Sequence, residues 1–529
     1  MNNYWEKLPS ATPELPLLVL NIPKGRNQVS LTAKVASGVK WSTITLVGKQ
    51  ILAMSNKIIL AHMLPASAYG LLGMATVIIG FVEIFADLGT ASAIIQRKEI
   101  TDDLMSSVFW MNILLGLLIT GALTGIAPFA ASFFQEPQVT IIVSILSFSF
   151  LLSSFSIVQR AVLRRQMAFK SLAGIELTSV ILSVIVGIAM AIAGAGVWSL
   201  VVATLTDTAA ETILLWLISP WRPRLHLDWN ELYYIASFSI NLSGVNTLNY
   251  FVMNADNLLV GRFLGAMALG YYTLSYAIIL VPVQRFAWAL GRVFLPTFAL
   301  IQNDNDRFRR AYLRLCGVIV AVWFPLMLGM TCTADLLVIV VLGPKWMTIV
   351  SLLILLAPIS MIQSVSITLN QIYMAKGRTD LMFRWGLVTG FVSIWAFFAG
   401  LPWGVNGVAT GYLIANLLIV YPSLAIPFRL IELPVRDLVR VIYPAFKYTL
   451  FMTTTIILLR LILLHLGILS SWIVLVGVIL FGVTVYLGLL LLYKPPIVHD
   501  LVGVLPLNHF PGLRWLVCRL GLSYKHSTE

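Results

Sequence analysis

Long apolar segments separated by short connections occupy most of this chain, and they constrain its fold more than any other feature. The segments 472–492 and 311–330 are examples that can each cross the roughly 30 Å apolar core of a bilayer as a helix of about 20 residues. Of the 529 residues, 59% are hydrophobic and only 11% are charged, whereas a soluble protein carries about a quarter charged residues. We therefore predict an all-α polytopic membrane protein with about fourteen transmembrane helices.

The connections between the apolar segments alternate in charge. Every second connection holds Lys or Arg and the others hold almost none, with Arg262 and Lys345 as exceptions. Because Lys and Arg are retained on the cytoplasmic face, the alternation predicts an even number of spans and cytoplasmic termini. It also accounts for the net charge of +13 without nucleic acid as a partner. The basic residues are Arg97, Lys98, Arg160, Arg164, Arg165, Lys170, Arg222, Arg224, Arg307, Arg309, Arg310, Arg314, Lys376, Arg378, Arg384, Arg429, Arg436 and Arg440.

Motifs of catalytic and metal centres are nearly absent from the sequence. The three cysteines, Cys316, Cys332 and Cys518, are scattered and predict neither a disulfide framework nor a metal site. The segment 304–306 has the DxD spacing of glycosyltransferases, but it opens a helical segment without a nucleotide-binding domain, and we interpret it as a helix cap. No cofactor, metal or catalytic residue is predicted. Three GxxxG spacings predict close helix packing: Gly121 and Gly125, Gly386 and Gly390, and Gly407 and Gly411.

The chain contains an internal repeat. Residues 56–70 match residues 256–270 without a gap, and at nearly the same offset residues 196–197 match residues 404–405. A chance likeness between two apolar helix ends is the alternative. A repeat of six spans predicts two halves in the same orientation around a central cavity. The predicted parts are a cytoplasmic arm (1–33), a six-helix lobe (34–218), a cytoplasmic linker (219–231), a second six-helix lobe (232–431), two extra helices (432–492) and a cytoplasmic tail (493–529).

Several acidic residues lie within the apolar segments, where a charge costs a few kcal/mol unless it faces a cavity or a partner. Glu83 and Asp87 share one helix face, as do Asp207 and Glu211, because each pair is spaced four residues apart. With Asp256, these carboxylates are candidates for exchanging a proton or holding a sodium ion. The alternative is that the two pairs lie near the interface and pair with lysines of the first span.

A second set of candidate site residues consists of basic residues and asparagines. Arg285 and Arg292 lie two helical turns apart, and with Lys49 and Lys57 they could line a cavity that binds phosphate or pyrophosphate oxygens. The alternative is that Arg292 reaches the interface and Arg285 pairs with a carboxylate. Three amides predict a hydrated surface compatible with sugars: Asn246, Asn249 and Asn254.

An ordered set of motifs resembles a known family. The stretches are LAHMLPASAYG (60–70), FADLG (85–89), IIQRK (94–98), FWMN (109–112), QRAVLRRQMAFK (159–170) and GRTD (377–380). Together they resemble bacterial polysaccharide flippases of the Wzx and colanic-acid-exporter type, in the multidrug/oligosaccharidyl-lipid/polysaccharide (MOP) superfamily. The resemblance covers roughly residues 30–430.

The resemblance implies a V-shaped bundle of two six-helix lobes, with two extra C-terminal helices like those of related lipid II flippases. It implies ion-driven transfer of an undecaprenyl-pyrophosphate-linked oligosaccharide from the cytoplasmic to the periplasmic leaflet of the inner membrane, with polysaccharide polymerase and export proteins as further partners. Arg285 is the best positional match to a cationic cavity residue. One alternative is a multidrug/cation antiporter of the same superfamily. The other alternative is a membrane polysaccharide polymerase, which would require a sizeable periplasmic loop.

Overall fold

The computed structural model describes residues 27–86, 94, 101–226, 229–467 and 472–493. In this part the side chains of 27–40, 43, 85, 86, 229–249, 285–293 and 295–297 are not described. Every regular element of the described residues is a helix, which confirms the predicted all-α class.

The first bundle contains seven of the helices. They are α1 (Asn27–Met63), α2 (Ala66–Ala86), α4 (Asp102–Phe134), α5 (Gln138–Ser154), α6 (Ile157–Arg165), α7 (Phe169–Ile192) and α8 (Trp198–Ile218). Within the bundle α4 packs along α5, and α7 packs along both α1 and α8. Thr101 caps the start of α4, because its side chain accepts a hydrogen bond from the backbone N–H of Leu104. The helices α5 and α6 meet at a bend of 41°.

The second bundle and an added helix pair form the remainder. The helices are α9 (Trp229–Leu300), α10 (Asn305–Cys332), α11 (Ala334–Leu337), η1 (Val338–Leu342), η2 (Pro344–Trp346), α12 (Thr348–Ser366), α13 (Leu369–Ala375), α14 (Thr379–Gly400), η3 (Leu401–Trp403), α15 (Gly404–Leu430), α16 (Val435–His465) and α17 (Trp472–Tyr493). Asp304 caps α10 by accepting from the backbone N–H of Arg307, so the interpretation of 304–306 as a helix cap is confirmed.

The longest element, α9, is two antiparallel helices. Gly265 interrupts it with a φ of 84°, a backbone conformation that glycine adopts readily. Asp256 and Tyr272 share a hydrogen bond of 2.9 Å, yet sixteen residues of a straight helix would separate them by about 24 Å. The chain therefore reverses direction at Gly265.

The spans agree with a polytopic membrane fold. By length and composition, eleven helices of the described part can cross a membrane, or twelve if α5 and α6 are one bent span. Two of these segments contain a reversal, one at Gly265 and one at η3, where the Trp385 indole N–H on α14 donates to the Ser423 hydroxyl on α15 over 3.0 Å. This arrangement is compatible with the predicted fourteen spans, and the number itself stays a prediction.

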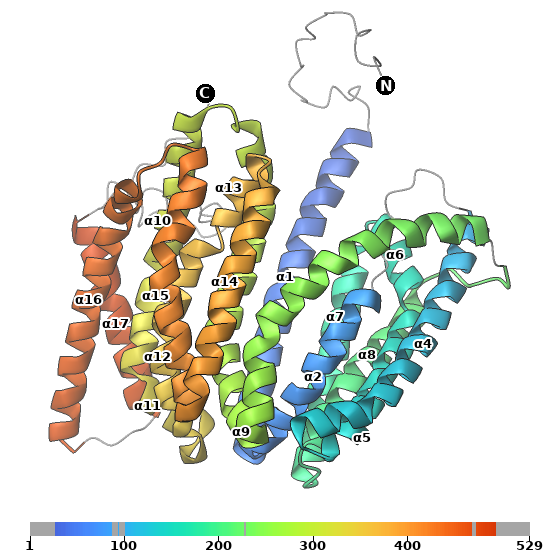
Figure 1. Cartoon of the computed structure of the whole chain (residues 1–529), viewed down its shortest axis with the longest axis horizontal. Coiled ribbons are helices and arrows are strands. Elements are labelled where there is room, and N and C mark those ends of the chain that lie inside the picture. The colour runs from blue at the N-terminus through green and yellow to red at the C-terminus, as the bar shows by residue number, and fades with distance from the viewer. Residues whose placement is uncertain (1–26, 87–93, 95–100, 227–228, 468–471, 494–529) are drawn as a thin grey trace, which may run out of the picture.

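Figure 1 shows a V-shaped arrangement. The helices α2, α4, α5, α7 and α8 lie on one side, α10 to α17 lie on the other, α1 lies between them, and the first part of α9 runs from the outer edge of the first group to the middle. The two groups diverge toward the end at which α1 begins, and α6 and α13 lie at this same end. It carries basic residues such as Arg164, Arg165 and Lys376, so we call it the basic end. The opposite end includes α11 and the turn at Gly265.

The added pair α16 and α17 attaches to the second bundle. α16 packs along α10, and an Arg460 guanidinium nitrogen lies 2.6 Å from the Asp335 carboxylate beyond the end of α10. Burial raises the pKa of Asp335, but the hydrogen bond and charge of Arg460, together with backbone hydrogen bonds, hold the pKa below its ordinary value. Arg460 also donates to the carbonyl of Cys332. Asp335, an acidic residue of an apolar segment, is thus a tether between helices.

The three GxxxG spacings differ in outcome. A Cβ on Gly407 would lie 2.2 Å from the carbonyl oxygen of Gly400, and one on Gly411 would lie 2.4 Å from that of Ala396. These two glycines let α14 and α15 approach closely, as predicted. The prediction is wrong for Gly121 and Gly125, because nothing lies within 4 Å of an added Cβ at either position. In the described part of the chain, no neighbouring helix packs against these two positions.

We expect Gly407→Ala to lower the free energy of unfolding by about 1–3 kcal/mol, because the added methyl meets a backbone carbonyl that no side-chain rotation can move. A lower Tm of the detergent-purified protein would measure this loss. Gly386→Ala, in α14, is the matched control, because nothing lies within 4 Å of an added Cβ there, and its Tm is expected not to fall. Equal Tm values for Gly407→Ala and wild type would contradict the close crossing of α14 and α15.

Candidate functional site

An aspartate is buried in the membrane-spanning part of the second bundle. Asp256, in the first half of α9, is only 3% exposed. The Tyr272 hydroxyl donates to its Oδ2 over 2.9 Å, and the backbone N–H of Asn257 donates to its Oδ1 over 2.8 Å. Among the described residues, no lysine or arginine pairs with this carboxylate. An unpaired carboxylate at bilayer depth is costly, so Asp256 is suited to taking up a proton or a small cation.

Other polar groups extend this site across three helices. Tyr276 of α9 interacts with both Asp256 and Tyr412 of α15, and the Gln363 amide of α12 donates to the Tyr412 hydroxyl over 2.7 Å. The sequence analysis found Asp256 and missed these partners. They lie far apart in the chain, and a single tyrosine or glutamine in an apolar segment carries no spacing signal that joins it to the others.

Two ion pairs hold charged residues inside the first bundle. Lys49 Nζ of α1 lies 2.9 Å from Glu176 Oε2 of α7. An Arg160 guanidinium nitrogen of α6 lies 2.8 Å from Glu211 Oε1 of α8. Lys49, predicted to line a phosphate site, thus has a carboxylate partner. Glu211, predicted as an ion-coupling residue, has a fixed cationic partner.

Asp207 lies beside these pairs. The Ser179 hydroxyl of α7 donates to Asp207 Oδ1 over 2.8 Å. Asp207, Glu176, Lys49 and Arg160 all lie close enough to act electrostatically on Glu211. The cluster therefore holds more carboxylates than cations, and it joins α1, α6, α7 and α8. The alternative interpretation assigns the two carboxylate pairs to lysines of the first span, but the ion pair of Glu211 is with Arg160 of α6, and the residue that pairs with Lys49 is Glu176.

The other predicted site residues are not gathered around either cluster in the described part. Glu83, on α2, and Lys57, on α1, are both exposed. The Asn254 amide donates to the carbonyl of Tyr250 in its own helix over 3.1 Å. Asp87 lies outside the described residues, as do the side chains of Arg285, Arg292, Asn246 and Asn249.

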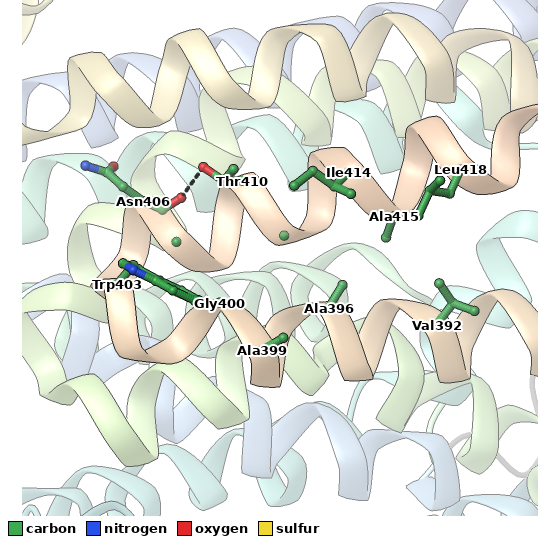
Figure 2. Close-up of a pocket in the computed structure, with 12 residues that line it drawn as sticks. Val392, Ala396, Ala399, Gly400, Trp403, Asn406, Thr410, Ile414, Ala415 and Leu418 are labelled. Atoms are coloured by element: carbon green, nitrogen blue, oxygen red, sulfur yellow. Dashed lines mark hydrogen bonds between the residues drawn. The ribbon is translucent and has the colours of Figure 1, made fainter.

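A separate groove of about 490 Å³ lies between α14 and α15. Figure 2 shows its lining, which is mostly apolar, with Trp403, Asn406 and Thr410 near one end. The Thr410 hydroxyl donates to the carbonyl of Asn406 over 2.7 Å. None of the residues predicted for the site lines this groove. Among the described residues, no group of three or more His, Cys, Asp or Glu side chains could hold a metal ion.

The two bundles meet at the opposite end, where α2 crosses the second half of α9. A Cβ on Gly70 would lie 1.6 Å from the carbonyl oxygen of Ala266, and one on Gly270 would lie 1.8 Å from that of Ala66. The contact is reciprocal, and its two sides are the repeat-related segments 66–70 and 266–270. Such symmetry argues against a chance likeness between these segments. At this end the two bundles are closed backbone against backbone.

Comparisons with known proteins agree with this architecture. The family model described as polysaccharide biosynthesis protein matches residues 59–351. The chain is 29% identical to the lipopolysaccharide biosynthesis protein WzxC of Escherichia coli K12, over 74% of this chain and 80% of that protein. It is also 29% identical to the teichuronic acid biosynthesis protein TuaB of Bacillus subtilis 168, over 67% of this chain and 74% of that one.

Solved structures share the fold at low sequence identity. The lipid II flippase MurJ, in an inward closed conformation, aligns with a TM-score of 0.67 and 17% identity, over 86% of this chain and 99% of its own. An inward-facing MATE family transporter of the MOP superfamily aligns with a TM-score of 0.59 and 15% identity, over 75% of this chain and 98% of its own. These two structures share the fold of this chain. Because the family model covers more than half of its length, the chain belongs to the polysaccharide biosynthesis protein family.

Proposed function

We propose that this chain moves a lipid-linked oligosaccharide, carried on undecaprenyl pyrophosphate, from the cytoplasmic to the periplasmic leaflet of the bacterial inner membrane. The product would supply exopolysaccharide, capsule or O-antigen synthesis. The family match supports this proposal, as does a relative named a succinoglycan biosynthesis transport protein, ExoT of Rhizobium meliloti, which is 24% identical over 67% of this chain.

The main structural support is that the described parts of the two bundles meet at one end and diverge toward the other. The reciprocal contact of Gly70 and Gly270 joins the bundles at the opposite end, and they diverge toward the basic end (Figure 1). If the basic end is cytoplasmic, as retention of Lys and Arg predicts, the bundles diverge toward the side where the lipid-linked substrate is made. Alternating access then requires this contact to part while the basic end closes.

Within this cycle, we assign the pyrophosphate to Arg285 and Arg292, whose forked donors suit phosphate oxygens. Lys49 and Lys57 are further candidates, although Lys49 would first have to leave Glu176, which lies 2.9 Å away. The hydrated surface for the glycan would include Asn246, Asn249 and Asn254. The lipid tail would stay in the bilayer. A polysaccharide polymerase and export proteins would act on the product.

Ion coupling is assigned first to Asp256. Its burial and its two neutral donors provide a site in which protonation, or a sodium ion, would change the local charge. A bound ion that favours one of two conformations shifts their populations by its differential affinity. The cluster around Asp207 and Glu211 is the second candidate, and the pair Glu83 and Asp87 the third.

Complementation of a flippase-deficient strain tests the function. We expect the wild-type chain to restore polymer export, and Arg285→Ala and Arg292→Ala each to reduce export by about tenfold or more, because each loses a charge-assisted phosphate contact. Arg285→Lys and Arg292→Lys, which keep the charge and lose the fork, are expected to be intermediate. Full export by both alanine variants would disprove the phosphate assignment. Failure of the well-inserted wild type in its own host's deletion strain would disprove the function.

A multidrug/cation antiporter is the second candidate, because the MATE transporter shares the fold with a TM-score of 0.59. The family match favours the polysaccharide function. Efflux of ethidium from cells expressing the chain, without restored polymer export, would favour the antiporter over the flippase. A polymerase is less well supported, because the described connections at the opposite end are short turns such as η3.

A further inference from the structure

The two cations that break the charge alternation both connect the bundles at the opposite end. Lys345 belongs to η2 of the second bundle, and its Nζ donates to the carbonyls of His62 and Leu64 in the first bundle over 2.8 and 2.9 Å. The Arg262 guanidinium, on α9, lies 6.0 Å from the ring centre of Phe133 on α4. Each cation thus reaches from the second bundle to the first.

Trp346 makes the connection at Lys345 tighter. Its side chain is 1% exposed, and its indole N–H donates to the carbonyl of Ala61 over 2.8 Å. The indole packs edge-on against Tyr69 of α2 at a centroid distance of 5.6 Å, and against Tyr271 of α9 at 5.7 Å. One side chain therefore contacts both bundles beside the crossing of α2 and α9.

The hydrogen bonds from Lys345 and Trp346 go to carbonyls at the C-terminal end of α1, where hydrogen-bond donors are lacking within the helix. The last four carbonyls of a helix have no partner within the helix and carry partial negative charge, which favours a nearby cation. α1 ends at Met63, so Ala61 and His62 are in its last turn. Their carbonyls receive donors from the second bundle, Trp346 and Lys345 respectively. The end of α1 is capped by the other half of the molecule.

We propose that Lys345 and Trp346 form a clasp, which holds the opposite end closed by capping α1 across the bundle interface and opens whenever that end opens. The clasp gives a structural role to Lys345, one of the two cations that break the charge alternation. Its part in a transport cycle rests on the proposed function, whereas its effect on the closed conformation does not. Arg262 supports the same closure at a second point.

The test is a distance between the bundles at the opposite end. Cysteines are introduced at the exposed positions Gln138 on α5 and Pro402 on η3, in full-length protein whose three native cysteines are replaced by alanine. Spin labels on this pair report the separation by pulsed electron resonance, without any substrate. Lys345→Met removes the donors and nearly preserves the side-chain length.

We expect Lys345→Met to raise the ratio of long to short distances by about threefold to tenfold, since charged hydrogen bonds to two carbonyls are lost. Trp346→Phe, which keeps a ring and loses the N–H, is expected to shift the ratio in the same direction. Lys345→Arg is expected to stay near the wild-type distribution, as is Lys447→Met, a charge loss at an exposed site on α16.

Unchanged distances in both Lys345→Met and Trp346→Phe would overturn the clasp, even if the chain exports polymer. An equal shift in Lys447→Met would also overturn it, because loss of any lysine would then suffice. Conversely, the expected shift in a chain that never restores export would support the clasp and count against the proposed function. The two proposals can therefore fail separately.

Discussion

Gly70→Val is expected to reduce polymer export by about tenfold or more while the protein remains in the membrane. A Cβ at this position would lie 1.6 Å from the carbonyl oxygen of Ala266, and a backbone carbonyl in a packed helix cannot move aside at small cost. The opposite end could then not close, so the cycle would lose one of its two end states. Export in the complementation strain, with the amount of membrane-inserted protein from immunoblots, measures the effect.

Gly174→Val, on α7 of the same bundle, is the matched control for Gly70→Val. It adds the same side chain at an exposed position with nothing within 4 Å of the new Cβ, and we expect wild-type export. Gly270→Val is expected to behave like Gly70→Val, because its Cβ would lie 1.8 Å from the carbonyl oxygen of Ala66. Normal export by both interface variants would show that the reciprocal contact is not part of the working cycle.

The second large effect is expected from Asp256→Asn, which should reduce export by about tenfold or more without lowering the Tm. The amide has nearly the size of the carboxyl; its oxygen can accept from the Asn257 N–H while its NH2 donates to the Tyr272 hydroxyl, so both contacts are retained. Removing a charge from this buried site relieves a desolvation cost, so a purely structural Asp256 would tolerate the change. A loss of export at unchanged or higher Tm therefore indicates an ionisation that transport requires.

Asp335→Asn is the control for Asp256→Asn. Asp335 also lies in an apolar segment, but it is paired with Arg460 over 2.6 Å and lies outside the spans. We expect the Asp335→Asn variant to restore polymer export to close to the wild-type level, with at most a small loss of Tm. Full export by Asp256→Asn would remove this residue from the coupling mechanism and leave the Asp207 and Glu211 cluster as the next candidate.

Features that depend on neighbours along the chain could be predicted from the sequence. The apolar spans follow from segment length, the shared end of the basic connections follows from their alternation, and the cap at Asp304 follows from local hydrogen bonding. The repeat 56–70 and 256–270 also indicated the segments that later proved to contact each other through Gly70 and Gly270. The sequence similarity predicted that the two segments are copies of one repeat. It did not predict that they contact each other, which the structure shows.

Features that depend on which helices are neighbours could not be predicted. The GxxxG spacing is equal at Gly121 and at Gly407, but only Gly407 has a helix packed against it. Tyr272 lies sixteen residues from Asp256, and they meet only because the chain reverses at Gly265. Lys345 is an exception to the charge pattern, and its partner His62 on α1 lies in the other half of the sequence. The spacing of residues along the chain does not show which helices will be neighbours in the fold.

Exposure of lipid-linked oligosaccharide at the outer surface of the membrane tests the central proposal most directly. Spheroplasts of the native host, with and without this chain, are incubated with a membrane-impermeant antibody against the host polymer. The captured fraction of lipid-linked oligosaccharide is compared with the total after detergent lysis. We predict that deletion of the chain lowers the captured fraction to background and that a plasmid copy restores it. An equal captured fraction with and without the chain would contradict the proposed transfer.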